Sequence, residues 1–230
     1  MYAAMTAKPY RLLVFDWDGT LIDSEAKIIA ILNTVIDELA LHPVAPGLIR
    51  NVIGLAIPEA MAQLFASYST DLQRRIVQRY RYHFTHPDSP VSSLFPGTMA
   101  TLAHLRRAGY VLCVATSKSR QGLDQELERT QLRDYFAMTR CADETRSKPD
   151  PLMLREIMAH FDARPEETLV IGDSEYDLGM ASNAGTDAVV VVSGAHSRER
   201  LLAWFPRACL DSIVDLPRWL HAVGQPTMYA

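Results

Sequence analysis

The sequence has few cysteines, and Cys113, Cys141 and Cys209 are scattered with no Cys-x-x-Cys spacing. A thiolate zinc site and a disulfide framework are therefore not expected, and we expect a reducing, cytoplasmic setting. No apolar run approaches the ~20 residues that cross a bilayer. The segment Met1–Tyr10 lacks the apolar stretch of a signal peptide, so we expect no membrane partner.

The chain also lacks a strong charge of one sign. Its 23 Lys and Arg against 27 Asp and Glu give a net charge of −4, which provides no general attraction for nucleic acid. It has no Gly-x-x-x-x-Gly-Lys-Ser/Thr loop, so a kinase or an ATPase is not expected. At 230 residues with 48% hydrophobic side chains, the composition fits one large globular domain or a core with a smaller insert.

Short apolar runs separated by helical patterns indicate the fold class. The clear runs are continuous and rich in Val, Ile and Leu, which is typical of strands buried on both faces of a parallel sheet. They are Leu12–Phe15, Val111–Ala115, Leu169–Ile171 and Ala188–Val192, with a weaker one at Phe136–Thr139. Strand and helix alternate after residue 93, so the sequence predicts an α/β fold with a doubly wound, Rossmann-like parallel sheet.

One stretch, from Ile22 to about Ser92, shows no convincing strand. Apolar residues recur there at helical spacing, and Thr70-x-x-Gln73 has the pattern of a capping box. We expect residues 22–92 to form an inserted all-helical cap. Residues 8–21 and 93–230 would then form the α/β catalytic core.

Polar clusters follow the predicted strands directly. The strand at 12–15 is followed by Asp16-Trp17-Asp18-Gly19-Thr20, and the strand at 111–115 by Thr116-Ser117-Lys118. The strand at 169–171 is followed by Gly172-Asp173. Because ligands bind beyond the carboxyl ends of strands in an open parallel sheet, these clusters should meet at one edge. Lys148 lies just before another predicted helix and should join them.

The residue types at this edge point to phosphoryl transfer. Asp16, Asp18 and Asp173 would repel one another as bare carboxylates, and an all-oxygen ligand set with few protein ligands suits Mg²⁺. Thr116, Ser117 and Lys148 would supply the hydroxyl, N–H and ammonium donors that hold phosphate oxygens. A phosphoryl-transfer site consists of carboxylates, a metal and hydrogen-bond donors that hold the phosphate oxygens.

With these motifs in order, the sequence resembles the haloacid dehalogenase superfamily of aspartate-nucleophile phosphatases. The closest resemblance is to the phosphoglycolate-phosphatase-like members with a helical cap, and it extends from Tyr10 to about Ala195. The matching segments are Asp16-x-Asp18-Gly19-Thr20, then Thr116, then Lys148-Pro149-Asp150-Pro151, then Gly172-Asp173-Ser174-x-x-Asp177. Relatives commonly carry Thr where this chain has Ser174.

The resemblance implies a role for each matching residue. Asp16 would attack phosphorus and form an aspartyl-phosphate, and Asp18 would serve as general acid and then general base. Thr116 and Lys148 would hold the transferring phosphoryl group. Mg²⁺ would bind Asp16, the Asp18 main-chain carbonyl and Asp173. Asp177 would order Lys148 or a metal-bound water from behind these ligands.

Each residue also has an ordinary structural interpretation. Asp-x-Asp occurs in surface loops, Thr116 or Asp177 could cap a helix, Lys148 could be a solvated lysine, and Asp173 could be a turn residue. The order of the motifs along the chain favours function. Arg50 and Glu25 are additional candidates for substrate contacts from the cap, although a surface arginine is equally compatible with the sequence.

The sequence therefore predicts a Mg²⁺-dependent phosphatase for a small phosphorylated metabolite, with phosphoglycolate as the first guess. A sugar phosphomutase and a phosphonate hydrolase remain alternatives, as does a non-catalytic binding or regulatory protein on the same scaffold. A haloacid dehalogenase is disfavoured because its reaction does not need the acid at Asp18. The choice between a monomer and a homodimer stays open.

Overall fold

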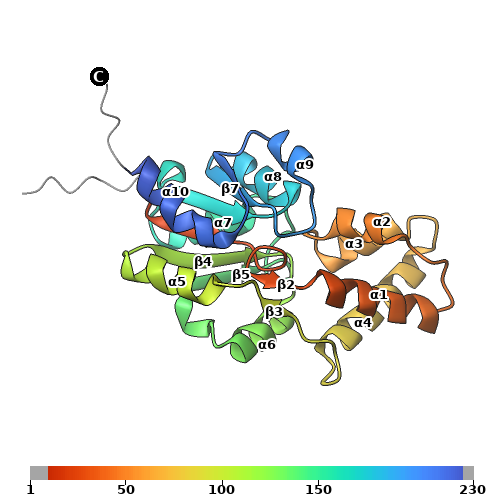
Figure 1. Ribbon diagram of the computed structural model, residues 1–230. Coiled ribbons are helices and arrows are strands. Elements are labelled where there is room, and N and C mark those ends of the chain that lie inside the picture. The colour runs from red at the N-terminus through yellow and green to blue at the C-terminus, as the bar shows by residue number, and fades with distance from the viewer. Residues whose placement is uncertain (1–9, 225–230) are drawn as a thin grey trace, which may run out of the picture.

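A computed structural model describes residues 10–224 (Figure 1). Residues 8–9 and 225–230, which the predicted core includes, lie outside the described residues. Six parallel strands form one sheet in the order β5-β4-β1-β6-β7-β8. They are β1 Leu12–Phe15, β4 Val111–Thr116, β5 Met138–Cys141, β6 Thr168–Gly172, β7 Asp187–Val191 and β8 Ala208–Leu210. The predicted doubly wound α/β fold is confirmed.

Helices cover both faces of this sheet because alternate strand residues face two apolar cores. Leu13 and Phe15 pack on one side, with α5 (Thr98–Arg107), α6 (Arg120–Thr130) and α10 (Leu216–Val223). Leu12 and Val14 pack on the other, with α7 (Leu152–His160), α8 (Glu175–Ala184) and α9 (Arg198–Leu202). The central strands are buried on both faces, which is why they read as continuous apolar runs.

Of the helices between β1 and β4 in the chain, the first four form a separate bundle beyond the sheet (Figure 1). They are α1 Glu25–Glu38, α2 Pro46–Val52, α3 Ile57–Leu64 and α4 Thr70–Thr85. The bundle has its own apolar core, to which Leu32, Val35, Phe65 and Ile76 contribute. Within residues 10–224, no helix combines the length and the apolar character that a bilayer span requires.

Several local expectations were wrong. Two short strands, β2 (Ile22–Asp23) and β3 (Ser93–Leu94), pair antiparallel where the helical bundle joins the sheet. They are two residues each, too short to show a strand period. The cap of α4 is Ser69, which accepts a hydrogen bond from the Leu72 N–H, and not Thr70. Strand β8 also escaped prediction because its three residues are only partly buried.

Candidate active site

The predicted convergence of polar side chains occurs at the carboxyl edge of β1 and β6. Carboxylate oxygens of Asp16, Asp173 and Asp177 lie within 4.8 Å of one another, and all three residues are buried. The Asp16 N–H donates to the Ile171 carbonyl at 2.8 Å, so the β1–β6 pairing itself sets the start of the Asp16 loop. Adjacent parallel strands thus deliver Asp16 and Asp173 to one point.

Lys148 is fully buried between two of these carboxylates. Its Nζ lies 2.7 Å from Asp16 Oδ1 and 2.6 Å from Asp177 Oδ1. Burial acts to lower the pKa of Lys148, but Asp16 and Asp177 outweigh it and the pKa is raised, so the ammonium stays charged. Asp177 Oδ2 accepts from the Ser174 N–H and hydroxyl. Asp177 therefore both caps the N-terminus of α8 and holds the Lys148 ammonium in place.

The carboxylate cluster carries more negative charge than Lys148 balances. Burial raises the pKa of Asp16 to about 7, with Lys148 opposing the shift and Asp177 adding to it. Burial, with Asp16 and Asp177 nearby, also raises the pKa of Asp173 well above its usual range. An oxygen-only donor set with unbalanced charge fits a hard divalent cation such as Mg²⁺.

Asp173 is held in place by short contacts with backbone and side chain. The Thr20 hydroxyl donates to its Oδ1 at 2.8 Å, and the Ala195 N–H donates to its Oδ2 at 3.1 Å. Gly19 has φ +75°, and an added Cβ there would lie 2.2 Å from Asp173 Oδ2. A Cβ at Gly194 would lie 1.8 Å from the same oxygen. Asp173 thus occupies space that only glycine leaves open at both positions.

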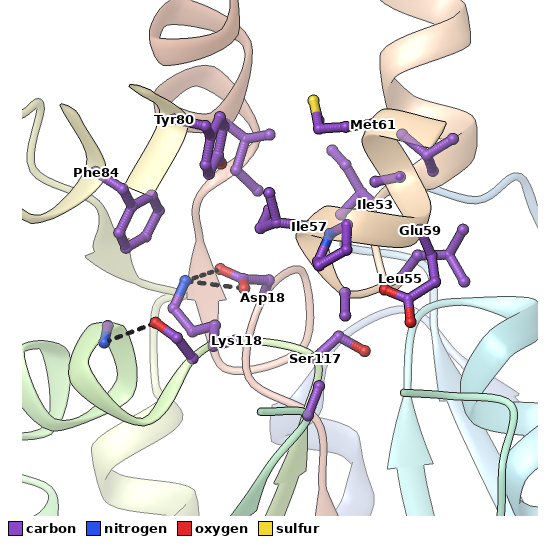
Figure 2. A pocket seen from close by; sticks show the side chains of 18 of the residues that line it. Asp18, Ile53, Leu55, Ile57, Glu59, Met61, Tyr80, Phe84, Ser117 and Lys118 are labelled. Carbon is purple, nitrogen blue, oxygen red and sulfur yellow. Dashed lines mark hydrogen bonds and ion pairs between the residues drawn. The ribbon is translucent and has the colours of Figure 1, made fainter. Parts of the chain in front are cut away.

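The Asp18 side chain is not part of this cluster. Its Oδ1 and Oδ2 lie 2.8 and 2.9 Å from Nζ of Lys118 (Figure 2). The same Nζ is 3.3 Å from Glu126 Oε2. The Trp17 indole N–H donates to that same glutamate oxygen. The sequence interpretation assigned no role to Lys118 or Glu126. The available signal was the position of Lys118, two residues after Thr116 at a strand's carboxyl end.

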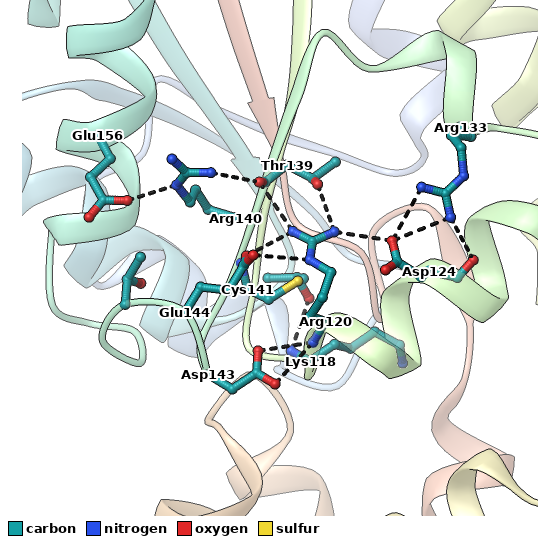
Figure 3. Close-up of polar contacts among 12 residues, drawn as sticks. Lys118, Arg120, Asp124, Arg133, Thr139, Arg140, Cys141, Asp143, Glu144 and Glu156 are labelled. Atoms are coloured by element: carbon teal, nitrogen blue, oxygen red, sulfur yellow. Dashed lines mark hydrogen bonds and ion pairs between the residues drawn. The ribbon is translucent and has the colours of Figure 1, made fainter.

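The segment that carries Lys118 is anchored by Arg120 (Figure 3). The Arg120 N–H donates to Asp143 Oδ1 at 2.9 Å, and its guanidinium bonds Thr139 Oγ1 at 2.9 Å and Glu144 Oε2 at 2.8 Å. The Lys118 carbonyl accepts from the Ala142 N–H at 3.2 Å. These contacts tie the loop after β4 to the loop after β5, so Lys118 extends from a fixed backbone.

Thr116 and Ser117 lie where β4 ends. Thr116 is buried, and its hydroxyl oxygen accepts from the Lys118 N–H at 3.3 Å. The Ser117 hydroxyl donates to the Gly54 carbonyl at 2.6 Å, which joins the core to the loop between α2 and α3. Thr116 thus lines the same cavity as Asp16, and the Ser117 hydroxyl is directed toward the helical bundle.

Arg50 and Glu25 are placed differently. The Arg50 Nε lies 2.7 Å from Glu25 Oε1, and both side chains are substantially exposed to solvent. Neither residue lines the cavity that opens beside Asp16. The structure therefore pairs these two candidates with each other, outside the cavity that Asp16 lines.

That cavity, of about 260 Å³, lies between the sheet edge and the helical bundle (Figure 2). Asp16, Asp18 and Thr116 line its sheet end, and apolar side chains of α1–α4 line most of the part within the helical bundle. The carboxylates of Asp16 and Asp18 and the ammonium of Lys118 thus line one cavity with room for a small molecule. This combination can support covalent attack by a carboxylate with proton transfer nearby.

A family model for haloacid dehalogenase-like hydrolases matches residues 13–191. The chain belongs to the haloacid dehalogenase-like hydrolase family. The resemblance noted from the motifs is confirmed, and the matched span begins in β1 and ends with β7.

Individual relatives are similar to this haloacid dehalogenase-like hydrolase along nearly its whole length. "Probable phosphatase IndB" of Dickeya dadantii is 33% identical over 217 residues, covering 92% of this chain and 94% of that protein. A phosphoglycolate phosphatase of Vibrio parahaemolyticus is 26% identical, with coverages of 92% and 96%. A solved haloacid dehalogenase-like hydrolase of Bacteroides fragilis superposes with a TM-score of 0.83 at 27% identity, covering 90% of this chain and 99% of that one.

Proposed function

We propose that this protein is a Mg²⁺-dependent phosphatase that hydrolyses small phosphate monoesters through an aspartyl-phosphate. The observation that carries the proposal is the arrangement of Asp16. Its buried carboxylate opens on the cavity, is paired with Lys148 at 2.7 Å, and lies within 4.8 Å of Asp173 and Asp177. The relatives named as phosphatases support the same reaction class.

In the first half of the proposed reaction, an Asp16 carboxylate oxygen attacks phosphorus. The bond from phosphorus to the ester oxygen breaks, and Asp18 donates a proton to that oxygen, so the product leaves as a neutral alcohol. Lys148 and Thr116 bind the oxygens of the transferring group, and the Ser117 N–H is a further candidate donor. Asp177 holds Lys148 in position through its 2.6 Å contact.

In the second half, water attacks the phosphorus of the aspartyl-phosphate, and Asp18 accepts the proton from that water. Inorganic phosphate leaves, and the Asp16 carboxylate is restored. Asp16, the Asp18 main-chain carbonyl and Asp173 would hold Mg²⁺, whose positive charge lets an anionic carboxylate approach an anionic phosphate. Thr20 and the Ala195 N–H keep Asp173 oriented for this role.

The division of labour between the two parts of the chain belongs to this proposal. Residues 8–21 and 93–230 would form the catalytic core, and residues 22–92 the cap that excludes water and contacts the leaving group. The free cysteines among the described residues are compatible with a cytoplasmic protein. Phosphoglycolate stays a candidate substrate because several relatives carry that name.

The test is a phosphate-release assay on a panel of phosphorylated metabolites, with Mg²⁺ and with a chelator in its place. We expect turnover only with Mg²⁺, and loss of about 10³-fold or more in kcat for Asp16→Asn because the nucleophile is gone. Unchanged activity in a folded Asp16→Asn protein would refute the nucleophile assignment. Product analysis with a sugar phosphate separates a hydrolase, which frees phosphate, from a phosphomutase.

A further inference from the structure

The cavity beside Asp16 changes character along its length. Its sheet end is polar, whereas the part within the helical bundle is lined by aliphatic and aromatic side chains (Figure 2). Those side chains include Ile28, Leu32, Ile57, Met61, Tyr80 and Phe84. A leaving group attached to a phosphate at Asp16 would therefore extend into apolar surroundings.

The charges at the cavity wall do not favour a second anionic group. Only two of the lining residues are basic, Lys118 and Arg81. The Lys118 ammonium is already paired with Asp18 at 2.8 Å and with Glu126 at 3.3 Å, and Arg81 is exposed on α4. Glu59 and Asp143 add negative charge at the rim.

Other cations near the bundle are also compensated. Lys27 lies outside the lining, with its ammonium 4.0 Å from the Phe84 ring centroid and 3.9 Å from Glu126 Oε1. Arg50 is paired with Glu25 at 2.7 Å. A carboxylate or second phosphate on the leaving group would meet acidic side chains and a Lys118 ammonium that is already paired. The other lining cation, Arg81, is exposed to solvent, so water and salt screen its attraction for an anion.

We propose that this site selects phosphate monoesters whose leaving alcohol is apolar over those whose leaving group carries a second negative charge. The inference rests on the proposed phosphatase function and names the substrate class for the same site. An apolar cavity of about 150 Å³ suffices to hold benzene. The 260 Å³ here therefore accommodates a phosphoryl group at Asp16 and a small hydrocarbon beyond it.

The discriminating experiment uses ethyl, butyl and hexyl phosphate, whose alcohols have nearly the same basicity, together with 2-phosphoglycolate. Burial of each added methylene corresponds to about a fourfold gain in kcat/KM, converted from ~0.8 kcal/mol per CH₂. We expect kcat/KM to rise along the alkyl series, by about threefold or more per methylene, and butyl phosphate to exceed 2-phosphoglycolate.

Ile28 and Ile29 offer a matched pair of variants. Both are half-buried on α1, but only Ile28 lines the cavity. Ile28→Ser should flatten the dependence on chain length, lowering kcat/KM for hexyl phosphate by more than for ethyl phosphate. Ile29→Ser, which removes the same side chain one residue away, should leave the series as steep as in the unmodified protein. Equal flattening by both variants would point to a general loosening of the cap and would overturn the inference.

Failure of the inference is distinguishable from failure of the phosphatase proposal. If all the esters are cleaved with a flat series, or 2-phosphoglycolate is preferred, the enzyme is a phosphatase and the apolar selectivity is wrong. If no ester is cleaved with Mg²⁺ present, the phosphatase proposal fails. The pocket is then tested by calorimetric binding of ethyl- and hexylphosphonate, where tighter binding of the hexyl compound supports the inference and equal Kd values overturn it.

Discussion

The ammonium of Lys118 bridges Asp18, the proposed acid and base, to Glu126. It lies 2.8 Å from Asp18 Oδ1 and 3.3 Å from Glu126 Oε2, and both Lys118 and Glu126 are buried. Burial acts to lower the pKa of Lys118, but the two carboxylates outweigh it and raise the pKa, so the lysine remains charged. The Asp18 carboxylate is thus held at the cavity wall by a fixed cation.

Lys118→Met should release Asp18 from this position. We expect kcat to fall about 10²-fold, the lower end of what a general acid–base group supplies, with a smaller change in KM. Removing one partner of a buried ion pair should also lower the free energy of unfolding by roughly 3 kcal/mol. Steady-state kinetics and denaturant unfolding measure the two effects separately.

Two further variants separate positioning from folding. Lys118→Arg keeps the charge and should recover part of kcat. Adding Glu126→Gln to Lys118→Met removes one uncompensated carboxylate, so stability should return in part while kcat stays low. If kcat returned together with stability, Lys118 would be a structural residue only.

Mg²⁺ binding should strengthen as the pH rises. Burial raises the pKa of Asp16 to about 7, whereas an unfolded aspartate has a pKa near 3.9. Between these values the folded protein binds more protons than the unfolded chain, so stability without metal falls as pH rises from about 4 to 7. Mg²⁺ must displace those protons to bind, so the stabilisation of the folded protein by Mg²⁺ is largest at a pH where the carboxylates are already deprotonated.

Thermal unfolding with and without Mg²⁺ at pH 5.5 and pH 8 measures this coupling. The Mg²⁺-induced rise in Tm should be clearly larger at pH 8. Asp173→Asn should reduce the rise at both pH values, while Asp71→Asn, whose carboxylate is exposed on α4, should leave it unchanged. A Mg²⁺ effect that is the same at both pH values would contradict the coupling.

The sheet could be predicted from the sequence because its central strands are continuous apolar runs, and each ends in a polar cluster. β1 lies between β4 and β6 and pairs with both, so residues just past the ends of these strands lie close together. The edge where Asp16, Thr116 and Asp173 lie follows from this strand order. Local pattern and topology agree in this part of the chain.

The contacts around Asp18 could not be predicted in the same way. Lys118 lies 100 residues from Asp18 in the chain, and nothing local in either segment indicates that their side chains meet. Glu126 lies on the buried face of α6 beside Leu123 and Leu127, and its carboxylate is paired there with Trp17 and Lys118. Such pairings are set by tertiary packing, which single-sequence periodicity does not report.

Gly19→Ala should damage the Asp173 position. An alanine at φ +75° is strained by about 1–2 kcal/mol, and its Cβ would also collide with Asp173 Oδ2. We expect a loss of unfolding free energy larger than this strain and a several-fold weaker Mg²⁺ affinity by calorimetry.

Gly185→Ala is the matched control for that variant. Gly185 has φ +78°, yet an added Cβ would meet nothing within 4 Å. It should show the backbone strain alone, with Mg²⁺ affinity unchanged. Equal effects of the two substitutions on Mg²⁺ affinity would show that the collision with Asp173 has no influence on metal binding.

The end of α2 and the loop between α2 and α3 are held to the core by hydrogen bonds that should affect substrate binding. The Ser117 hydroxyl donates to Gly54 O at 2.6 Å, and the Tyr176 hydroxyl donates to Asn51 O at 2.8 Å. If both bonds serve to seat this loop, Ser117→Ala and Tyr176→Phe should each raise KM by about fivefold, since a hydrogen bond contributes ~1 kcal/mol. Steady-state KM values for one alkyl phosphate measure both.

The alternative is that the Ser117 hydroxyl contacts the phosphate itself. Ser117→Ala and Tyr176→Phe would then have different effects on KM. In that case only Ser117→Ala would raise KM. It would raise the Ki of inorganic phosphate by the same factor, because inorganic phosphate has no leaving group and its binding reports only the contacts to the phosphoryl group. The structure favours the seating role because the hydroxyl proton of Ser117 is already directed at Gly54 O. We therefore expect parallel increases in KM for both variants, with the Ki of inorganic phosphate unchanged.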